Sequence, residues 1–378
     1  MFVHILFTSK VYNQIKLQSF ERYNMSNTNK EINCAPSCKK TSIGGQALME
    51  GIMMRGPEKS AMAVRNAKGN IILETSENPK PPKVSKVPFL RGIFNMVSSL
   101  KIGYKYLMRS ADIAIADAEE ADREAKEAQK EKEQPVTEVV ETPVQEEIKE
   151  EPTEEKEEKK TSIATSVIMV LGVVFGVIIA VGLFIALPAT LYSLLDMAVP
   201  ADLTQKTIGM SIFRSAFEAV FKIILLVLYM LAVSRMKEIR RVFMYHGAEH
   251  KTIFCYEAGL PLTVDNIRSQ RRFHPRCGTS FLILVLLVSL FLGIFIPASL
   301  ALWIRILLKI ALLPLTIGIG YELIKLAGKK DNAFTRFISA PGVWLQHITT
   351  VEPDDSMIEC AIAAMNEVIP EDKTKDNW

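Results

Sequence analysis

Residues 161–190 read TSIATSVIMVLGVVFGVIIAVGLFIALPAT and contain no charged residue. From 163 to 187 the run is long enough for one helix to cross the hydrocarbon core of a bilayer. Three further apolar stretches follow, near 212–233, 281–296 and 300–326. The sequence therefore predicts a mainly α-helical, polytopic membrane protein with about four spans.

The second of these stretches is the least apolar, because Arg214, Glu218 and Lys222 lie in its first part. Their four-residue spacing places the three side chains on one helix face, where they can pair with each other and face the bundle or an interface. The last stretch carries Arg305 and Lys309 in its first half. We therefore expect ionisable groups inside the helical bundle.

Basic residues are concentrated in one loop, and this predicts an orientation. The segment 234–280 carries nine Lys and Arg residues, whereas the loop between the first two spans carries only Lys206. Lys and Arg in short loops favour the cytoplasmic side of a membrane. Both termini and the basic loop are therefore expected in the cytoplasm, in a multi-pass protein of the cell membrane.

Outside the spans the chain divides into segments of different composition. Residues 1–40 are interpreted as a disordered leader without a cleavable signal sequence. Residues 41–116 are expected to form a small cytoplasmic β-containing unit and an amphipathic helix, and residues 117–160 an acidic, disordered or partly helical tether. The membrane domain is assigned to residues 161–370 and includes C-terminal amphipathic helices over 333–368.

Two local patterns define the β-containing unit and its helix. The run AMAVRNAKGNIILE (61–74) predicts a hairpin whose turn gives Gly69 a positive φ. The stretch 88–115 has apolar residues at helical spacing, interleaved with basic ones such as Arg91 and Lys101. Such a stretch suits a membrane surface or, equally, a helix packed on a neighbouring element.

Composition excludes some classes of protein. The sequence has five cysteines, an odd number, and they are scattered along the chain, so it is not expected to be a protein built on a disulfide framework. The net charge of +3 is a balance between the acidic tether and basic stretches elsewhere, so the charge distribution carries more information than the total. A bilayer is the expected partner, with anionic lipid or a cytoplasmic protein or ribosome as further candidates, and no specific nucleic-acid recognition is expected.

The strongest chemical pattern lies in the basic loop, where His246, Glu249 and His250 form H-x-x-E-H. In a helix the two histidines project from one face at i, i+4, the spacing by which two imidazoles hold one metal ion. The glutamate of that pattern serves as a general base, or as a further ligand. His274 and Cys277 offer further ligands before the chain re-enters the membrane. We expect these residues to bind a divalent transition metal, zinc or iron. The competing interpretation is a closed metal site, or no metal, with histidines and arginines at the lipid headgroup level that pair with Glu249, Glu257 and phosphates.

Other candidate binding residues are Glu50, Arg55 and Arg276. The first two lie in the glycine-rich string GGQALMEGIMMRGP (44–57), which lacks the G-K-[ST] of a phosphate loop. Glycines there favour close packing or a sharp turn, and Arg55 is a candidate anion contact. Arg276 lies between His274 and Cys277.

Four strings of the sequence resemble the YqhQ-like family of bacterial membrane proteins, a family classed as a domain of unknown function. The strings are GGQALMEGIMMRGP (44–57), YHGAEHKTIFCYEAG (245–259), HPRCGTSF (274–281) and PGVWLQHITTVEPDDSMIECAIAA (341–364). The resemblance covers residues 41 to about 370 and implies a predicted metal-dependent enzyme, with His246, Glu249, His250, His274 and Cys277 as its metal positions.

These observations leave two functional hypotheses, with a third ranked lower. The first is a hydrolase that acts on a peptide, a lipid headgroup or a phosphoester at a cytoplasm-facing site, with Glu249 as its base. The second is a non-enzymatic scaffold or accessory factor whose basic loop binds lipid, nucleotide or a protein or ribosome partner. An open coordination position on the metal, with a pocket beside Glu249, favours the enzyme. A metal with all its positions occupied by protein ligands, or candidate ligands too far apart to share one ion, favours the scaffold. A transporter ranks lower because internal repeats are not evident.

Overall fold

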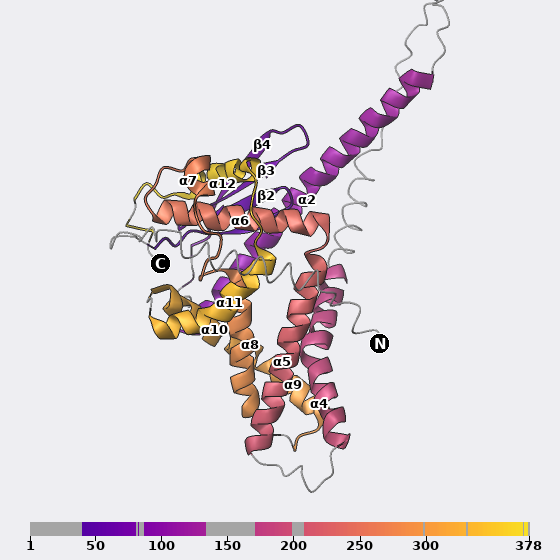
Figure 1. The fold of residues 1–378 in the computed structure, drawn as a ribbon, viewed down its shortest axis with the longest axis vertical. Helices are drawn as coiled ribbons and strands as arrows, with labels where there is room; N and C mark the ends of the chain where they lie inside the picture. The colour runs from indigo at the N-terminus through magenta and orange to yellow at the C-terminus, as the bar shows by residue number, and fades with distance from the viewer. Residues whose placement is uncertain are drawn as a thin grey trace, which may run out of the picture.

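The structure is a computed structural model in which two halves of different character lie one above the other (Figure 1). The upper half contains a sheet and the helices around it, and the lower half is a bundle of apolar helices. The structure as a whole describes residues 40–80, 82, 87–133, 171–198, 208–297, 299–329, 332–372 and 374–376. The expected leader up to residue 39, the tether over 134–160 and the start of the first expected span, 163–170, lie outside the described residues.

The sheet has four antiparallel strands in the order β1-β2-β3-β4. Alternation along the strands sends Ile52 and Met54 to one face and Met53 to the other, and both faces are buried. Gly69 has φ 86° in the turn between β3 and β4, which confirms the predicted hairpin. The strands are β1 Gly44–Leu48, β2 Gly51–Arg55, β3 Lys59–Arg65 and β4 Ile71–Glu77.

Helix α2, Leu90–Glu133, covers one face of the sheet. Tyr106 and Ile113 are buried against Met53 and Met62. Of the two interpretations of this stretch, packing on a neighbouring element is therefore the one observed here. It also continues through the first part of the expected tether, as far as Glu133. This acidic part has no buried residue among those described, and its i, i+4 ion pairs stabilise helix without a core.

The opposite face of the sheet is covered by helices from the second half of the chain. Met357 and Met365 on α12 are fully buried against strands β2 and β3, and Asp354 caps this helix by accepting from the Met357 N–H. Tyr245 on α6 joins the same core. These helices are α6 Lys237–Glu257, α7 Val264–Arg268 and α12 Asp355–Val368.

The lower half contains two helices, Leu171–Met197 and Gly209–Val233, that are long and apolar enough to cross a membrane. A third candidate is the pair α9 and α10, which meet at 45° close to Pro314, if the pair counts as one span. α8 is apolar but shorter. The described helices are η2 Gly182–Ala186 (a π-helix after helical residues 171–181), α4 Leu187–Ala198, α5 Ile208–Val233, α8 Gly278–Ile294, α9 Leu302–Ala311, α10 Leu313–Lys329 and α11 Ala333–Thr349.

The first helix differs from its expected limits, because it does not end at Pro188 but continues to Ala198. A proline inside a helix lacks an N–H and crowds the carbonyl four residues earlier. The π-helical turn η2, Gly182–Ala186, lies directly before Pro188, where this crowding arises. A wider turn of this kind accommodates the proline without ending the helix.

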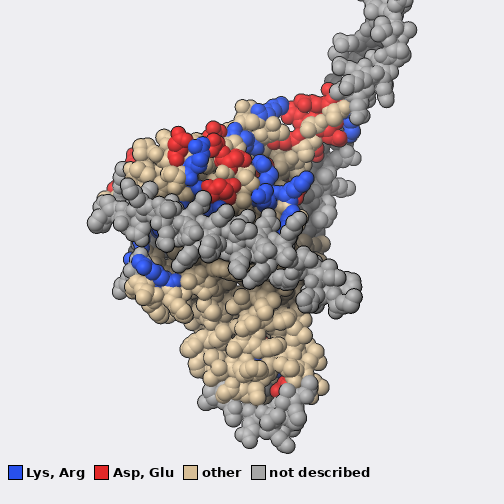
Figure 2. All heavy atoms as spheres, in the orientation of Figure 1, with Lys and Arg blue, Asp and Glu red and all other residues tan. Residues whose placement is uncertain are grey.

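Charge is divided between the two halves. Lys, Arg, Asp and Glu side chains gather over the sheet and the helices around it, while the visible surface of the lower bundle is almost free of them (Figure 2). Phe175, Phe213 and Trp303 in the bundle are each more than half exposed. Arg214 and Glu218, by contrast, are buried inside it, facing the bundle as the spacing predicted. The bundle therefore exposes large apolar side chains and buries most of its charged ones, with Asp196 on α4 as an exposed exception.

Candidate metal centre

The cluster begins on α6, which is helical through the whole H-x-x-E-H pattern as the i, i+4 argument requires. His246 and His250 are one turn apart, with ring centroids separated by 4.4 Å. Cys277 approaches from the N-terminus of α8, with its Sγ 3.1 Å from His246 Nε2. One ligand atom from each of these three residues lies within 4.8 Å of the other two, which is close enough for one metal ion.

Backbone carbonyls orient both imidazoles. His246 Nδ1 lies 2.9 Å from the Thr349 carbonyl, and His250 Nδ1 lies 2.5 Å from the Arg272 carbonyl. Because a carbonyl only accepts, each Nδ1 carries a proton, and Nε2 is the nitrogen left on each ring to bind a metal when the ring is neutral. Histidines that ligate metals are held in this way, with the second ring nitrogen donating to a carbonyl or carboxylate.

The electrostatics of the trio favour a thiolate. Burial alone would raise the pKa of Cys277, but His246 and His250 hold the pKa of this thiol well below its usual value. In the same way burial opposes the charged form of His246, while the Cys277 thiolate raises the pKa of the imidazole. A thiolate beside two imidazoles is a donor set that suits zinc and iron.

Glu249 faces the same space from α6 without being one of the three close ligands. It is 6% exposed, and its Oε1 accepts a hydrogen bond of 3.0 Å from the Gly45 N–H at the start of β1. Burial raises the pKa of Glu249, although His246 and His250 act in the opposite direction. A Cβ at Gly45 would lie 2.7 Å from the Met53 carbonyl and 3.0 Å from Glu249, so the close approach of this strand requires glycine.

A cavity of about 350 Å³ opens beside the cluster. Its walls come from β1, α6 and the start of α8, and they include His246, Glu249, His250 and Cys277. The volume is within the range of small-molecule sites, and most of the lining is apolar with a few convergent polar groups. The cluster is therefore open on one side to a space of the size that holds a small molecule.

His274 lies next to the trio but outside it. Its ring centroid is 5.4 Å from that of His250, and its Nδ1 accepts the backbone N–H of Arg276 at 3.3 Å. Burial, with nearby His250 and Arg276, holds the pKa of His274 well below its usual value, so the ring is neutral. The ring also lines a second cavity of about 450 Å³ that Arg271 and Arg276 share.

The loop that carries His274 is fixed by Gln346 on α11, which is fully buried. Its amide accepts the His274 N–H and donates to the His274 carbonyl, both at 2.7 Å, and also donates to Ser280 Oγ at 3.1 Å. Sequence patterns did not single out Gln346. The signal that could have found it is a polar residue between Leu345 and Ile348 in an apolar helix.

The other candidate binding residues each have a protein partner. Arg55 donates to the hydroxyls of Ser98 and Ser99 on α2, and Glu50 pairs with Arg241. Neither lines the cavity beside the cluster. Arg276 does line it, while its guanidinium pairs with Glu257 and donates to the Thr41 carbonyl at 2.9 Å.

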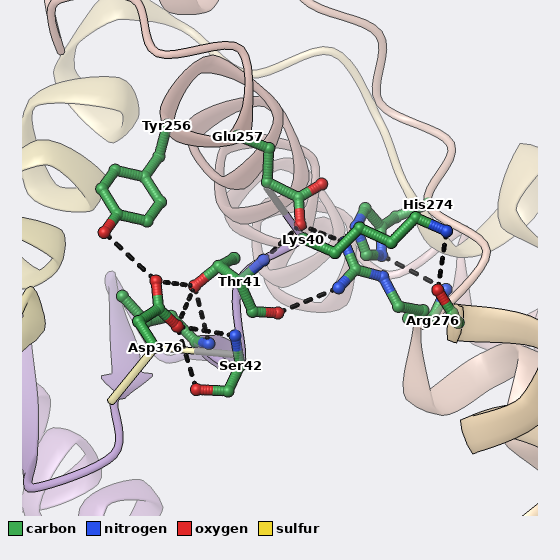
Figure 3. Close-up of polar contacts among 10 residues, drawn as sticks. Lys40, Thr41, Ser42, Tyr256, Glu257, His274, Arg276 and Asp376 are labelled. Carbon is green, nitrogen blue, oxygen red and sulfur yellow. Dashed lines mark hydrogen bonds and ion pairs between the residues drawn. The ribbon is translucent and has the colours of Figure 1, made fainter. Parts of the chain in front are cut away.

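The segment before β1 is fastened by residues from distant parts of the chain (Figure 3). The carboxylate of Asp376 accepts from the hydroxyl of Thr41 at 2.7 Å, from the Ser42 hydroxyl and backbone N–H, and from the Tyr256 hydroxyl. Glu257 accepts the Thr41 N–H at 2.8 Å. These contacts hold β1 in place as one wall of the cavity.

Comparisons with known proteins identify the family. A model of a protein of unknown function (DUF1385) matches residues 87–371. An uncharacterised protein, YqhQ of Bacillus subtilis (strain 168), is 34% identical over 335 residues, which cover 87% of this chain and 92% of the relative. No solved structure matches the chain. Neither description names a metal or a reaction, and on the extent of both matches the chain belongs to the DUF1385 family.

Proposed function

We propose that this protein is a metal-dependent hydrolase held in the cell membrane by about four spans, with its site facing the cytoplasm. Membrane placement is supported by the inverted distribution in the lower half, where Phe175 and Trp303 are exposed while Arg214 and Glu218 are buried. Such an arrangement is unfavourable in water and favourable in lipid. The nine basic residues of 234–280 support a cytoplasmic position for the cluster and for both termini.

The observation that carries the metal proposal is the geometry of His246, His250 and Cys277. Their ligand atoms lie within 4.8 Å of one another, and both Nδ1 atoms are used by backbone carbonyls. Two imidazoles and a thiolate leave one position open in a tetrahedral site, the arrangement found in catalytic rather than structural zinc centres. A divalent zinc or iron ion fits this donor set.

Glu249 and the cavity support hydrolysis. A bound metal would supply Lewis-acid polarisation of the substrate. Glu249 lies on the same helix face and lines the same cavity, and its pKa is raised, as a general base near neutral pH requires. Its hydrogen bond from Gly45 holds the carboxylate in a fixed orientation. Peptides, lipid headgroups and phosphoesters stay equal candidates for the substrate.

The test is the metal content of the full chain purified in detergent, measured by mass spectrometry. We expect about one zinc or iron per chain in the wild type, and a loss of at least tenfold in His246→Ala and Cys277→Ser. The matched control is His347→Ala, because His347 is exposed and lies outside the cluster. A wild type that folds without metal, or variants that keep it, contradicts the proposal.

Catalysis is separated from a structural role of the metal by Glu249→Gln. We expect this variant to keep the metal, since Glu249 is not among the three close ligands, and to lose hydrolysis by a factor of 100 or more. The assay uses a panel of peptide, phospholipid and phosphoester substrates. Full metal content together with no hydrolysis by the wild type on any of them would favour the scaffold hypothesis.

A further inference from the structure

The interior of the lower bundle carries an excess of positive charge. Arg214, Lys222 and Arg305 are each at most 8% exposed, and the side chain of Lys309 is 12% exposed. Among the described residues of α4, α5, α8 and α9, the only buried carboxylate is Glu218. Asp196 on α4 also acts on Arg214, but it is exposed, so the buried cations outnumber the buried carboxylate. A charge without compensation is unfavourable in such surroundings.

The pairing inside the bundle is incomplete. Glu218 pairs with Lys309, and one nitrogen of Arg214 donates to the carbonyls of Gly293 and Ile296 at the end of α8. The second terminal nitrogen of Arg214, the Nε of Arg305 and the Oε1 of Glu218 have no hydrogen-bond partner among the described residues. Lys222 makes no hydrogen bond or ion pair with any described residue, although only 8% of it is exposed.

A cavity of about 280 Å³ lies beside these groups. Lys222 and Lys309 line it from two helices, and the remaining walls are apolar side chains and small polar groups, including Phe184, Leu286, Ser289 and Leu292. It thus combines cationic groups on one side with a hydrocarbon-like wall on the others. That combination matches a ligand with an acidic group and an apolar chain.

We propose that this bundle cavity binds the acidic headgroup of a membrane amphiphile, with Lys222 and Lys309 as its anion contacts and the apolar wall around its chain. Lys222 supplies the unpaired charge, since Lys309 already shares Glu218. A free anion would satisfy the charge but leave the apolar wall without a partner. The inference depends on the membrane placement proposed above and not on the metal.

The bundle cavity is separate from the candidate metal centre. Cys277 precedes α8, whereas Gly293 and Ile296, to which Arg214 donates, lie at its far end. On α8 the bundle cavity is lined from Val285 to Gly293 and the cavity beside the metal ligands from Gly278 to Leu282, and the two cavities share no lining residue. Neither Lys222 nor Lys309 lines the cavity beside the metal ligands. The two sites can therefore be tested independently.

The experiment measures binding of a soluble acidic lipid, dioctanoyl phosphatidate, to the full chain in a neutral detergent. Isothermal calorimetry gives the affinity, and tryptophan fluorescence gives the unfolding midpoint. We expect the phosphatidate to raise the midpoint by several degrees, because a ligand that binds only the folded state stabilises it. Neutral dioctanoylglycerol and inorganic phosphate are expected to give no shift. An equal shift of the unfolding midpoint by inorganic phosphate would show that a free anion is enough to fill the site, and would overturn the proposal of an amphiphile.

The decisive variant is Lys222→Met, which keeps the length of the side chain and removes its charge. We expect at least a tenfold loss of affinity, with a ligand-free midpoint equal to or above that of the wild type, because an unpaired buried charge has been removed. Lys237→Met, on the exposed surface of α6, is the control and should bind within twofold of the wild type. Unchanged lipid binding by Lys222→Met would overturn the proposed lipid site. The metal content of the same variant is measured as well, and if it equals that of the wild type, the result concerns the bundle cavity alone and not the metal centre.

Discussion

The two ends of α8 bury polar groups in different ways. At the N-terminal end, the thiol of Cys277 contacts His246, and Ser280 accepts a hydrogen bond from Gln346. At the other end, Arg214 donates to two carbonyls through one nitrogen, while its second terminal nitrogen has no partner among the described residues. The Gln346 network at the first end is paired and defines one geometry, although Thr349 Oγ1 and Arg272 Nε near it have no hydrogen-bond partner among the described residues. At the second end the unpaired groups are charged side chains, which leave a position for a ligand. The comparison predicts that substitutions at the first end destabilise the fold, and that those at the second end affect stability little.

The largest effect is expected for Arg276→Leu. The side chains of Arg276 and Glu257 are 5% and 10% exposed, and removing one partner of such a pair leaves an uncompensated buried charge. We expect a loss of about 3–5 kcal/mol in the free energy of unfolding. Chemical denaturation in detergent, followed by tryptophan fluorescence, measures it.

The control for this variant is Arg268→Leu. Arg268 pairs with Asp265 and Asp355 at the surface, and exposed ion pairs contribute little. Its denaturation midpoint should stay close to that of the wild type. Equal losses in the two variants would mean that the Arg276–Glu257 pair is not buried in the folded protein.

A smaller loss is expected for Gln346→Leu. The leucine fills the space but leaves the N–H and carbonyl of His274 without their partner, and such unpaired buried groups cost about 1–3 kcal/mol each. We expect about 2–4 kcal/mol in total, together with weaker metal retention because the loop before Cys277 is released. His347→Ala is the neighbouring exposed control, and stability equal to the wild type in Gln346→Leu would contradict the network.

The smallest effect is expected at the far end of α8, for Arg305→Met. The Nε of Arg305 has no partner among the described residues, so the substitution removes a buried charge and keeps most of the apolar stem. We expect the free energy of unfolding to change by less than about 1 kcal/mol in ligand-free protein. A loss as large as that of Arg276→Leu would show that the two ends are equally satisfied.

The elements with strong local signals were predictable from sequence. Gly69 in its turn was predicted, and the helix that the spacing of His246 and His250 assumes is present, because both depend on neighbours in the sequence. Membership of a family of unknown function was predicted as well, from strings spread over the chain. Two to three of the four expected spans have candidate helices of sufficient length, and the fourth stays a prediction.

What sequence patterns missed depends on contacts between distant segments. The carbonyls of Thr349 and Arg272, which orient the two imidazoles, are backbone groups with no residue signature. The pairing of Glu218 with Lys309 joins α5 to α9, whereas the four-residue spacing favoured pairs within one helix. The continuation of the first bundle helix past Pro188 was also missed. The π-helical turn before this proline has no reliable sequence signal.

The core around the sheet has a consequence for the order of folding during synthesis. Ile52 and Met54 on β2 are buried by Met357 and Met365 on α12, and Thr41 is held by Asp376. A ribosome completes these partners only after every helix of the lower bundle has been made. Until then the part of the sheet that α12 covers is exposed beside α6, and an exposed apolar surface of this kind is prone to aggregation or chaperone capture. Synthesis of the half that contains the sheet thus begins before that of the helical bundle and ends after it.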